Sequence, residues 1–238
     1  MKPTKLLKFL GKRKYYKEIK SEKDVIGLSD GDRLVGKNGI FIYRDDMLFR
    51  SVTKHQDEKL KELKETVEFK LPKVPMFILI SSLSLFRKAM EKHDSEAVVL
   101  LRISEDHDKY SIVIPEQEVS GMLIKEYDRS ACDDGNIVGS IHSHCDSSAF
   151  QSGTDHKDEI SFPGLHITLG KISNHMPDIH ARYMVRNFVD VSDLSDVIDF
   201  GDMYNFDNVD PYFFDNADKV IAEGLTKVKK KQSIVYTG

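Results

Sequence analysis

Three short, largely hydrophobic runs lie near the start of the chain, and turn-forming residues separate them. RLVG at 33–36, IFIYR at 40–44 and MLFRSV at 47–52 are rich in β-favouring residues. Lys37-Asn38-Gly39 and Asp45-Asp46 lie between these runs, and such turn residues are typical of β-hairpins. We therefore expect a small β meander over residues 32–53.

A different pattern follows at 54–70, where Leu60, Leu63 and Val67 recur at helical spacing on a charged background. This spacing predicts a short surface helix or connector. KLPKVP at 70–75 then marks a boundary, because proline cannot continue a helix and favours extended structure in the residue before it. We place the start of a second domain at Pro72, after an N-terminal β-rich appendage of residues 1–71.

From Pro72 onward, strand-like and helix-like segments alternate, which is typical of a mixed α/β domain. The helix expected at 82–93 has Ser81 or Ser82 as its cap, and one face of it carries Leu83, Phe86, Ala89 and Met90. The segments expected to be strands are 76–80, 97–103, 110–115, 136–141, 165–169 and 179–189. We expect this domain to end near residue 190.

Beyond residue 190 the chain is acidic and aromatic over 199–216 and then helical in pattern over 217–231. We treat 191–238 as a C-terminal extension. Three roles stay open for it and for residues 1–71: substrate recruitment, oligomerisation, and docking on a larger assembly. The lysines of the extension, Lys227 and the run 229–231, are expected to belong to a solvated tail.

Composition narrows the functions that the chain can have. Lys and Arg number 35 against 39 Asp and Glu, so the net charge is −4 and no basic field attracts nucleic acid. Two cysteines are too few for a disulfide framework, which favours a reducing compartment. No apolar run approaches the roughly 20 residues that span a bilayer, and no secretion signal is evident. We therefore expect a cytoplasmic protein whose partners include neither nucleic acid nor a membrane.

The candidate chemistry lies directly after the strand-like run at 136–141. His142 and His144 are spaced i and i+2, so at a strand end their imidazoles point to the same side and can bind one ion. Asp155 can add an oxygen ligand. Two nitrogens and one oxygen leave the fourth tetrahedral position of zinc open, as in catalytic rather than structural sites. The pattern therefore indicates a hydrolytic metal centre.

Ser152 and Asp155 also have a purely structural interpretation. Ser-x-x-Asp is typical of a helix capping box, with Ser152 as the N-cap of a short segment that ends near Pro163-Gly164. A helix that starts there places Asp155 in its first turn, from which it can turn back toward His142 and His144. Cap and metal ligand are therefore compatible.

This stretch resembles the JAMM (MPN+) metalloproteases, whose signature is His-x-His, seven residues, Ser, two residues and Asp. His142, His144, Ser152 and Asp155 match that spacing without an insertion. The family also has a glutamate where its first helix meets a hydrophobic strand, and Glu96 in HDSEAVVLL lies at that junction. The resemblance covers residues 76–190. Short strand connections, as at 104–109, are more similar to prokaryotic or phage members than to eukaryotic ones with long insertions.

The resemblance implies a cytidine-deaminase-like JAB/MPN fold, which is a curved mixed sheet flanked by helices, and one catalytic Zn²⁺. It implies that His142, His144 and Asp155 bind the metal. It further implies that Glu96 is the general base and that Ser152 donates a hydrogen bond to the oxyanion. The implied substrate is a protein or peptide, cleaved at an amide bond such as the isopeptide bond after a ubiquitin-like C-terminus.

Cys145 departs from the family pattern, because many members have proline after the second histidine. We expect the thiol to pack as a small side chain in place of that proline. Two alternatives are that it binds the metal and that it forms a closed Cys/His structural site with Cys132.

Other residues compete for the remaining roles. Glu116 and Glu118 are alternative general bases, although Glu96 is favoured. His156 is expected on an exposed helix face and His166 in a structural position. Two alternative functions share the expected fold: a non-catalytic scaffold that binds a partner, and a metal-dependent hydrolase of small molecules. Scaffold members typically lack the ligands that are present here.

Overall fold

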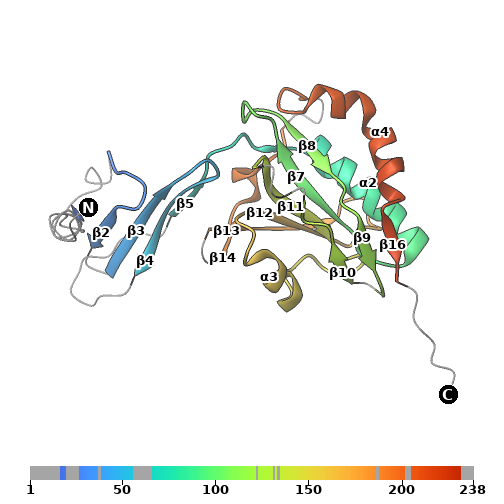
Figure 1. The fold of residues 1–238 in the computed structure, drawn as a ribbon, viewed down its shortest axis with the longest axis horizontal. Coiled ribbons are helices and arrows are strands. Elements are labelled where there is room, and N and C mark those ends of the chain that lie inside the picture. Colours follow the sequence, from blue (N-terminus) through green and yellow to red (C-terminus); the bar gives the residue numbers. More distant parts are fainter. Residues whose placement is uncertain are drawn as a thin grey trace, which may run out of the picture. The chain divides into compact units, whose positions relative to one another are not determined.

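A computed structural model of the chain describes most of the 238 residues. The described ranges are 17–19, 27–36, 39–55, 66–121, 123–130, 132, 135–185, 188–201 and 205–231. They form a mixed α/β structure, as expected from the sequence. The chain divides into two compact units, with the division between Lys70 and Leu71 (Figure 1). Each unit is described by itself below.

The first unit contains a five-stranded sheet in the order β1-β2-β3-β4-β5. Its strands are β1 (Lys17–Glu18), β2 (Arg33–Gly36), β3 (Gly39–Asp45), β4 (Phe49–His55) and β5 (Thr66–Phe69). β2, β3 and β4 pair antiparallel and confirm the predicted meander. The Asp46 carboxylate accepts the backbone N–H groups of Leu48 and Phe49, both at 2.8 Å, which fixes the turn between β3 and β4. The predicted turn residues Lys37 and Asn38 lie outside the described residues.

The helix expected at 54–70 is wrong in its described part, because Thr66–Phe69 is strand β5 and pairs antiparallel with β4. Thr66 and Val67 are β-branched, and exposure alternates along the segment with the period of two that a strand requires. Leu60 and Leu63, which carried the helical spacing, lie outside the described residues.

The second unit is built on a six-stranded sheet in the order β14-β13-β12-β11-β7-β8. Its strands are β7 (Val98–Ile103), β8 (Tyr110–Val113), β11 (Ile137–Ser143), β12 (Gly164–Gly170), β13 (Asp178–Met184) and β14 (Phe188–Asp190). Every residue of the central strands β11 and β12 is buried, and these two strands run parallel. The predicted strands at 97–103, 110–115, 136–141 and 165–169 are confirmed. The single strand expected at 179–189 is instead the antiparallel pair β13 and β14.

Helix α2 (Met76–His93) begins six residues earlier than expected, so the strand predicted at 76–80 is wrong. Five consecutive apolar residues show no period, and such a run fits a buried helix as well as a buried strand. Ser81 and Ser82 are buried inside the helix and do not cap it; Pro75 occupies the N-cap without a side-chain hydrogen bond.

Residues 191–201 and 205–231, which the sequence analysis placed in a separate extension, belong to the second unit. They contain a short 3-10 helix, η3 (Leu194–Asp196), and β15 (Ile198–Asp199), which pairs with β6 (Val74–Pro75). Helix α4 (Pro211–Leu225) lies beside α2 (Figure 1), where Phe77 contacts the rings of Phe206, Phe213 and Phe214. These contacts make the C-terminal segment part of the same core.

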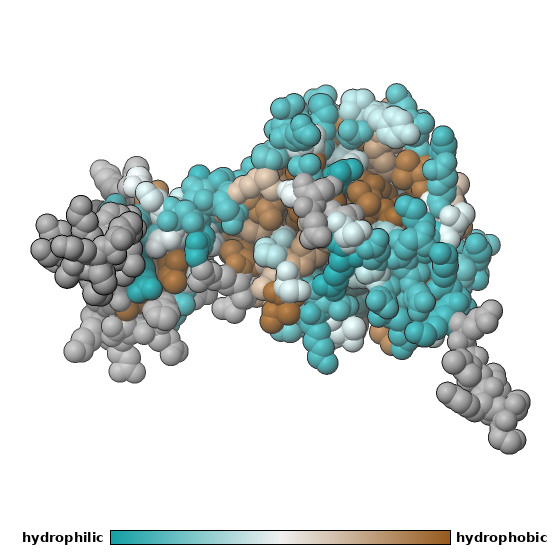
Figure 2. Space-filling model, viewed as in Figure 1, coloured by the Kyte–Doolittle hydropathy of each residue, from teal (hydrophilic) through white to brown (hydrophobic). Residues whose placement is uncertain are grey.

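The run 229–231 was expected in a solvated tail. Its side chains are exposed, but Lys229 and Lys230 lie in a strand, and Lys231 follows it directly. β16 (Val228–Lys230) pairs with β9 (Gln117–Val119), and β9 pairs with β10 (Ile124–Tyr127). Lys229 and Lys231 form exposed ion pairs with Glu116 and Glu118. Hydrophilic side chains accordingly cover this small sheet in Figure 2. No helix in the described ranges has the length and apolarity to cross a bilayer.

We predict that a fragment of residues 71–238 folds without the first unit. Residues 71–238 form a compact unit of their own, and the pairing of β6 with β15 ties the start of this unit to residues 198–199. Far-UV circular dichroism and urea unfolding of the fragment test this. A cooperative transition is expected, and an insoluble or non-cooperative fragment would show that residues 1–70 belong to the same folding unit.

We predict that Gly139→Ala strongly destabilises the second unit. A Cβ at Gly139 would lie 1.8 Å from the carbonyl oxygen of Leu165, on the neighbouring strand β12, and backbone cannot move aside cheaply. Overpacking of a core typically costs about 1–3 kcal/mol, and we expect at least the upper value here. Gly153→Ala is the matched control, because a Cβ there meets no heavy atom within 4 Å. Urea midpoints that are equal for the two variants would refute this packing argument.

Candidate metal centre

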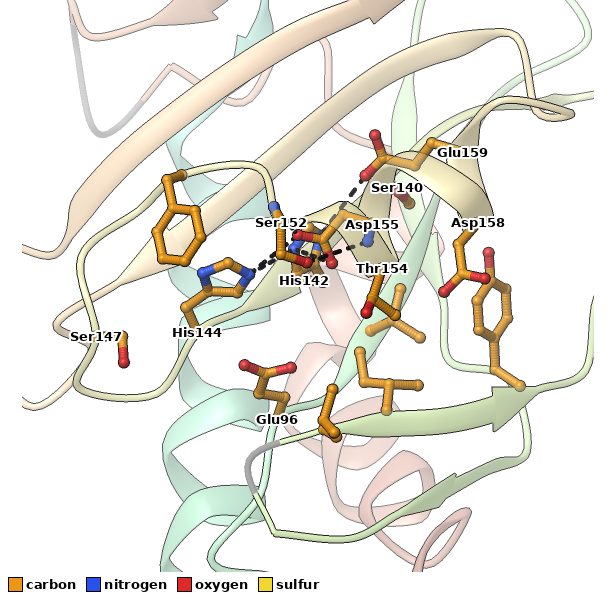
Figure 3. Close-up of a pocket in the computed structure, with 15 residues that line it drawn as sticks. Glu96, Ser140, His142, His144, Ser147, Ser152, Thr154, Asp155, Asp158 and Glu159 are labelled. Atoms are coloured by element: carbon orange, nitrogen blue, oxygen red, sulfur yellow. Dashed lines mark hydrogen bonds and ion pairs between the residues drawn. The ribbon is translucent and has the colours of Figure 1, made fainter.

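His142 and His144 lie at the C-terminal end of β11, which is an inner strand of the six-stranded sheet. His142 is on the strand and His144 follows it directly, so the two side chains emerge on the same side. Both side chains are almost fully buried, with 6% and 5% exposed. Figure 3 shows the two rings turned toward the Asp155 carboxylate.

Asp155 is held by helix α3 (Gly153–Glu159), which has Ser152 as its N-cap. The Ser152 hydroxyl accepts the Asp155 backbone N–H at 3.2 Å, and the Ser152 backbone N–H donates to Asp155 Oδ2 at 2.6 Å. The predicted capping box is therefore present. It turns the Asp155 carboxylate back toward the end of β11, so the structural and the metal-binding interpretations of this residue hold together.

The three side chains offer donor atoms at the spacing that a small metal ion requires. Nε2 of His144 lies 3.3 Å from Nε2 of His142 and 3.3 Å from Asp155 Oδ2, and Nε2 of His142 lies 3.5 Å from Asp155 Oδ1. Zinc binds nitrogen and oxygen ligands at about 2.0–2.1 Å, and a tetrahedron with such bonds has edges of about 3.3–3.4 Å. The two imidazoles face different oxygens of the Asp155 carboxylate, and each of the three side chains offers a donor atom within 4.8 Å of the other two, so together they can hold one small metal ion.

Charge within the cluster also suits a cation. Burial alone would raise the pKa of Asp155, but hydrogen bonds with His142 and His144 outweigh it and hold the pKa below its usual range. Burial alone would lower the pKa of His142, and the Asp155 carboxylate reverses this effect and raises it. Asp155 is therefore ionised, and its negative charge would balance part of the positive charge of a metal ion bound between the two imidazoles and this carboxylate.

A pocket of about 260 Å³ opens beside the cluster, and all five residues singled out from the sequence line it: Glu96, His142, His144, Ser152 and Asp155. Glu96 follows the C-terminal end of α2, where Asp94 adopts a left-handed conformation with φ of 51°. Burial raises the pKa of Glu96 to about 7, although the two histidines partly oppose the rise. In Figure 3 its carboxylate points toward the side of the pocket that carries His144.

No known protein family matches the chain, and no curated protein matches it. The metal centre therefore rests on the residues themselves: a motif of four fixed positions and the buried cluster that the fold makes from three of them.

The competing candidates lie elsewhere. Glu116 and Glu118 are exposed residues paired with lysines and do not line the pocket of the cluster. His156 is exposed on α3, against the ring of Phe188. His166 is fully buried, with Nδ1 bonded to the Ser140 hydroxyl and Nε2 to the Phe162 carbonyl, both at 2.8 Å. These contacts agree with a structural position for His166.

The two cysteines do not join the cluster of metal-binding atoms. Cys132 packs against Leu100, Ile137 and Phe162. Cys145 is buried and has a backbone φ of 47°, a value that proline cannot adopt. Proline could therefore not replace Cys145 in the left-handed turn that the chain makes after His144.

We predict that Cys145→Ser keeps its full metal content, because the thiol is a packing group here. Cys145→Pro should destabilise the protein by about 1–3 kcal/mol through strain in the turn. Elemental analysis and urea unfolding check the two expectations. Loss of metal from the serine variant would show that the thiol is a ligand.

Two buried charged residues near the cluster were missed from the sequence. Glu159 and Arg182 are 4% and 5% exposed and form an ion pair behind His142. Glu159 lies four residues after Asp155 and therefore on the same face of α3, which is the signal that could have identified it. Phe150 was also missed; it is 49% exposed, and its ring meets the His144 ring edge-on at 4.8 Å.

Proposed function

We propose that this chain is a zinc-dependent hydrolase of the JAMM type that cleaves amide bonds. The observation that carries the proposal is the buried cluster of His142, His144 and Asp155, which offer donor atoms within 4.8 Å of one another beside an accessible pocket. Three protein ligands leave one position for water or substrate, which distinguishes catalytic zinc sites from structural ones.

Bound zinc would supply Lewis acidity, which polarises a carbonyl and makes water a stronger acid at neutral pH. Glu96 lines the same pocket and is suited to accept the proton of the attacking water and pass it to the leaving amine. A pKa of about 7 allows a carboxyl group to perform both transfers near neutral pH.

Ser152 is suited to stabilise the oxyanion. Its hydroxyl oxygen accepts the Asp155 backbone N–H, so its own proton can be donated into the pocket that it lines. A donor in this role contributes about 3–4 kcal/mol where it has been measured in other enzymes. Asp155 thus binds the metal and also orients the serine through the capping box.

The pocket wall supports a peptide as substrate. Leu123, Ile124 and Tyr127 line it, and Ile124 and Tyr127 belong to β10, which is an edge of its sheet in the described part of the chain. An extended peptide can add to such an edge through backbone hydrogen bonds. The resemblance to JAMM proteases suggests a ubiquitin-like C-terminal tail as that peptide. Hydrolysis of a small molecule and partner binding without catalysis are the alternatives.

Cleavage of two probes separates these functions. One probe is a ubiquitin-like protein joined through its Gly-rich tail to a reporter protein; the other is a small acyl anilide. The proposal predicts metal-dependent release of the reporter, its loss on chelation and its return with added zinc. Cleavage of the anilide alone would favour a small-molecule hydrolase, and a metal-loaded protein that cleaves neither would favour a scaffold.

A further inference from the structure

Glu159 is a buried carboxylate that two neighbouring side chains, Arg182 and Gln151, hold in place. Its Oε2 accepts from Arg182 Nε at 2.8 Å, and Arg182 Nη2 lies 2.6 Å from the same oxygen. The amide nitrogen of Gln151 donates to Oε1 at 2.9 Å and to Oε2 at 3.1 Å. Burying an ion pair removes two charges from water, which rarely stabilises a fold more than apolar packing would. The pair therefore calls for another explanation.

The position of Glu159 relative to two histidines supplies one. Glu159 Oε1 lies 4.0 Å from Nδ1 of His142 and 3.9 Å from Nδ1 of His166. Both ring nitrogens of His166 already have closer partners at 2.8 Å. Nε2 of His142 is the nitrogen that faces His144 and Asp155, whereas Nδ1 faces the Glu159 carboxylate. A negative charge there favours a proton on Nδ1 and leaves the lone pair on Nε2.

Glu159 is also linked to Nε2 of His142, through the side chains of Gln151 and Thr168. Because the Gln151 amide nitrogen donates to Glu159, its carbonyl oxygen faces Thr168 and accepts the Thr168 hydroxyl proton. Thr168 Oγ1 lies 3.4 Å from His142 Nε2, and with its proton committed to Gln151 it presents only lone pairs to the ring. Thr168 therefore does not compete with a metal for the lone pair of Nε2.

We propose that Glu159, held by Arg182 and Gln151, is a positioning residue that fixes the ring orientation and tautomer of His142 and so sets the metal affinity. This inference rests on the metal site of the proposed function. Outer groups that hold a ligating histidine typically change metal affinity by about 10–100-fold.

The test is the zinc affinity of the full chain, measured by competition with a chromophoric chelator. Replacing Glu159 alone would leave the Arg182 charge buried and unpaired, so the decisive variant is the double substitution Glu159→Leu with Arg182→Met, which removes both charges. We expect it to unfold in urea close to the wild-type midpoint and to bind zinc about 10–100-fold more weakly. The absorption spectrum of bound Co²⁺ should also change, because the His142 ring is no longer held. A folded double variant with wild-type affinity would overturn the proposal.

Gln151→Leu gives a second answer if the double variant does not fold. Gln151 is only partly buried, and its loss keeps the Glu159–Arg182 pair while freeing the Thr168 hydroxyl to donate to His142 Nε2. We expect a roughly tenfold loss of zinc affinity at an unchanged unfolding midpoint, and an unchanged affinity would contradict the proposal.

Glu116→Gln is the matched control for both variants, because it breaks an exposed pair with Lys229 and should not alter zinc affinity. The wild-type protein separates the two levels of the account. A wild type that binds no zinc would refute the metal site and the proposed function, whereas tight binding that none of the variants weakens would refute only the role of Glu159.

Discussion

Replacing Glu96 by glutamine is expected to lower amide hydrolysis by about 10²- to 10⁴-fold while the zinc content stays unchanged. Glutamine keeps the size of the side chain and can still hydrogen-bond to water, but it cannot accept a proton. Glu96 lines the pocket and is not one of the three clustered donors, so its loss should not release the metal. Initial rates on the ubiquitin-like fusion and elemental analysis of the same sample measure the two effects.

Glu118→Gln is the control for this prediction, because Glu118 is exposed and paired with Lys231 outside the pocket. Its variant should hydrolyse the fusion at the wild-type rate. If Glu96→Gln cleaves the fusion at the wild-type rate and Glu118→Gln does not, the general base has been misassigned. The position of Glu96 at the junction of α2 and β7 would then have no catalytic role.

Replacing Asp155 should remove the metal and the activity together. Asp155→Ala deletes the oxygen donor, and we expect zinc to fall from about one ion per chain to a small fraction. Asp155→Asn separates ligand from cap, because its carbonyl oxygen can still accept the Ser152 backbone N–H but carries no charge. It should therefore fold like the wild type and still bind zinc poorly.

Ser152→Ala gives the opposite pattern and completes this test. It removes the acceptor of the Asp155 backbone N–H, which costs about 1 kcal/mol at a helix N-cap, and it leaves all three metal donors in place. Zinc content should be retained while turnover falls. If Asp155→Asn retained zinc as fully as Ser152→Ala does, Asp155 would be a cap and not a ligand.

Local sequence patterns predicted the parts of the fold in which the residue types of a segment and the turn or cap residues beside it indicate the same element. The meander of β2 to β4 follows from β-favouring runs on either side of turn residues such as Asp45-Asp46, and helix α3 follows from the Ser152 cap. The prediction failed at 76–80, because a wholly apolar run has no period and only its packing decides between helix and strand. It also failed at Val67, which was assigned to a helix only through its spacing from Leu60 and Leu63, whereas its own neighbours Thr66 to Phe69 alternate in exposure as a strand does.

The site residues divide in the same way: those close to one another in the sequence could be predicted, and those brought together from distant parts of the chain could not be predicted from local sequence. His142, His144 and Asp155 lie within 14 residues of one another, and their convergence needs only a strand end and a helix start. Glu96 comes from another part of the chain and depended on the resemblance to a family. The pairing of Glu159 with Arg182 was not predictable, because a charged residue on α3 and one on β13 are each expected at the surface. Only the packing of α3 against the sheet shows that both are buried.

X-ray absorption at the zinc edge of the full-length protein tests the central claim most directly, because it reports which atoms bind the metal. The account predicts about one zinc per chain, with a first shell of nitrogen and oxygen at about 2.0–2.1 Å, imidazole scattering from two histidines and no sulfur at about 2.3 Å. Sulfur scattering at this distance would show that Cys145 or Cys132 is a metal ligand, and a chain that holds no zinc would refute the metal centre itself.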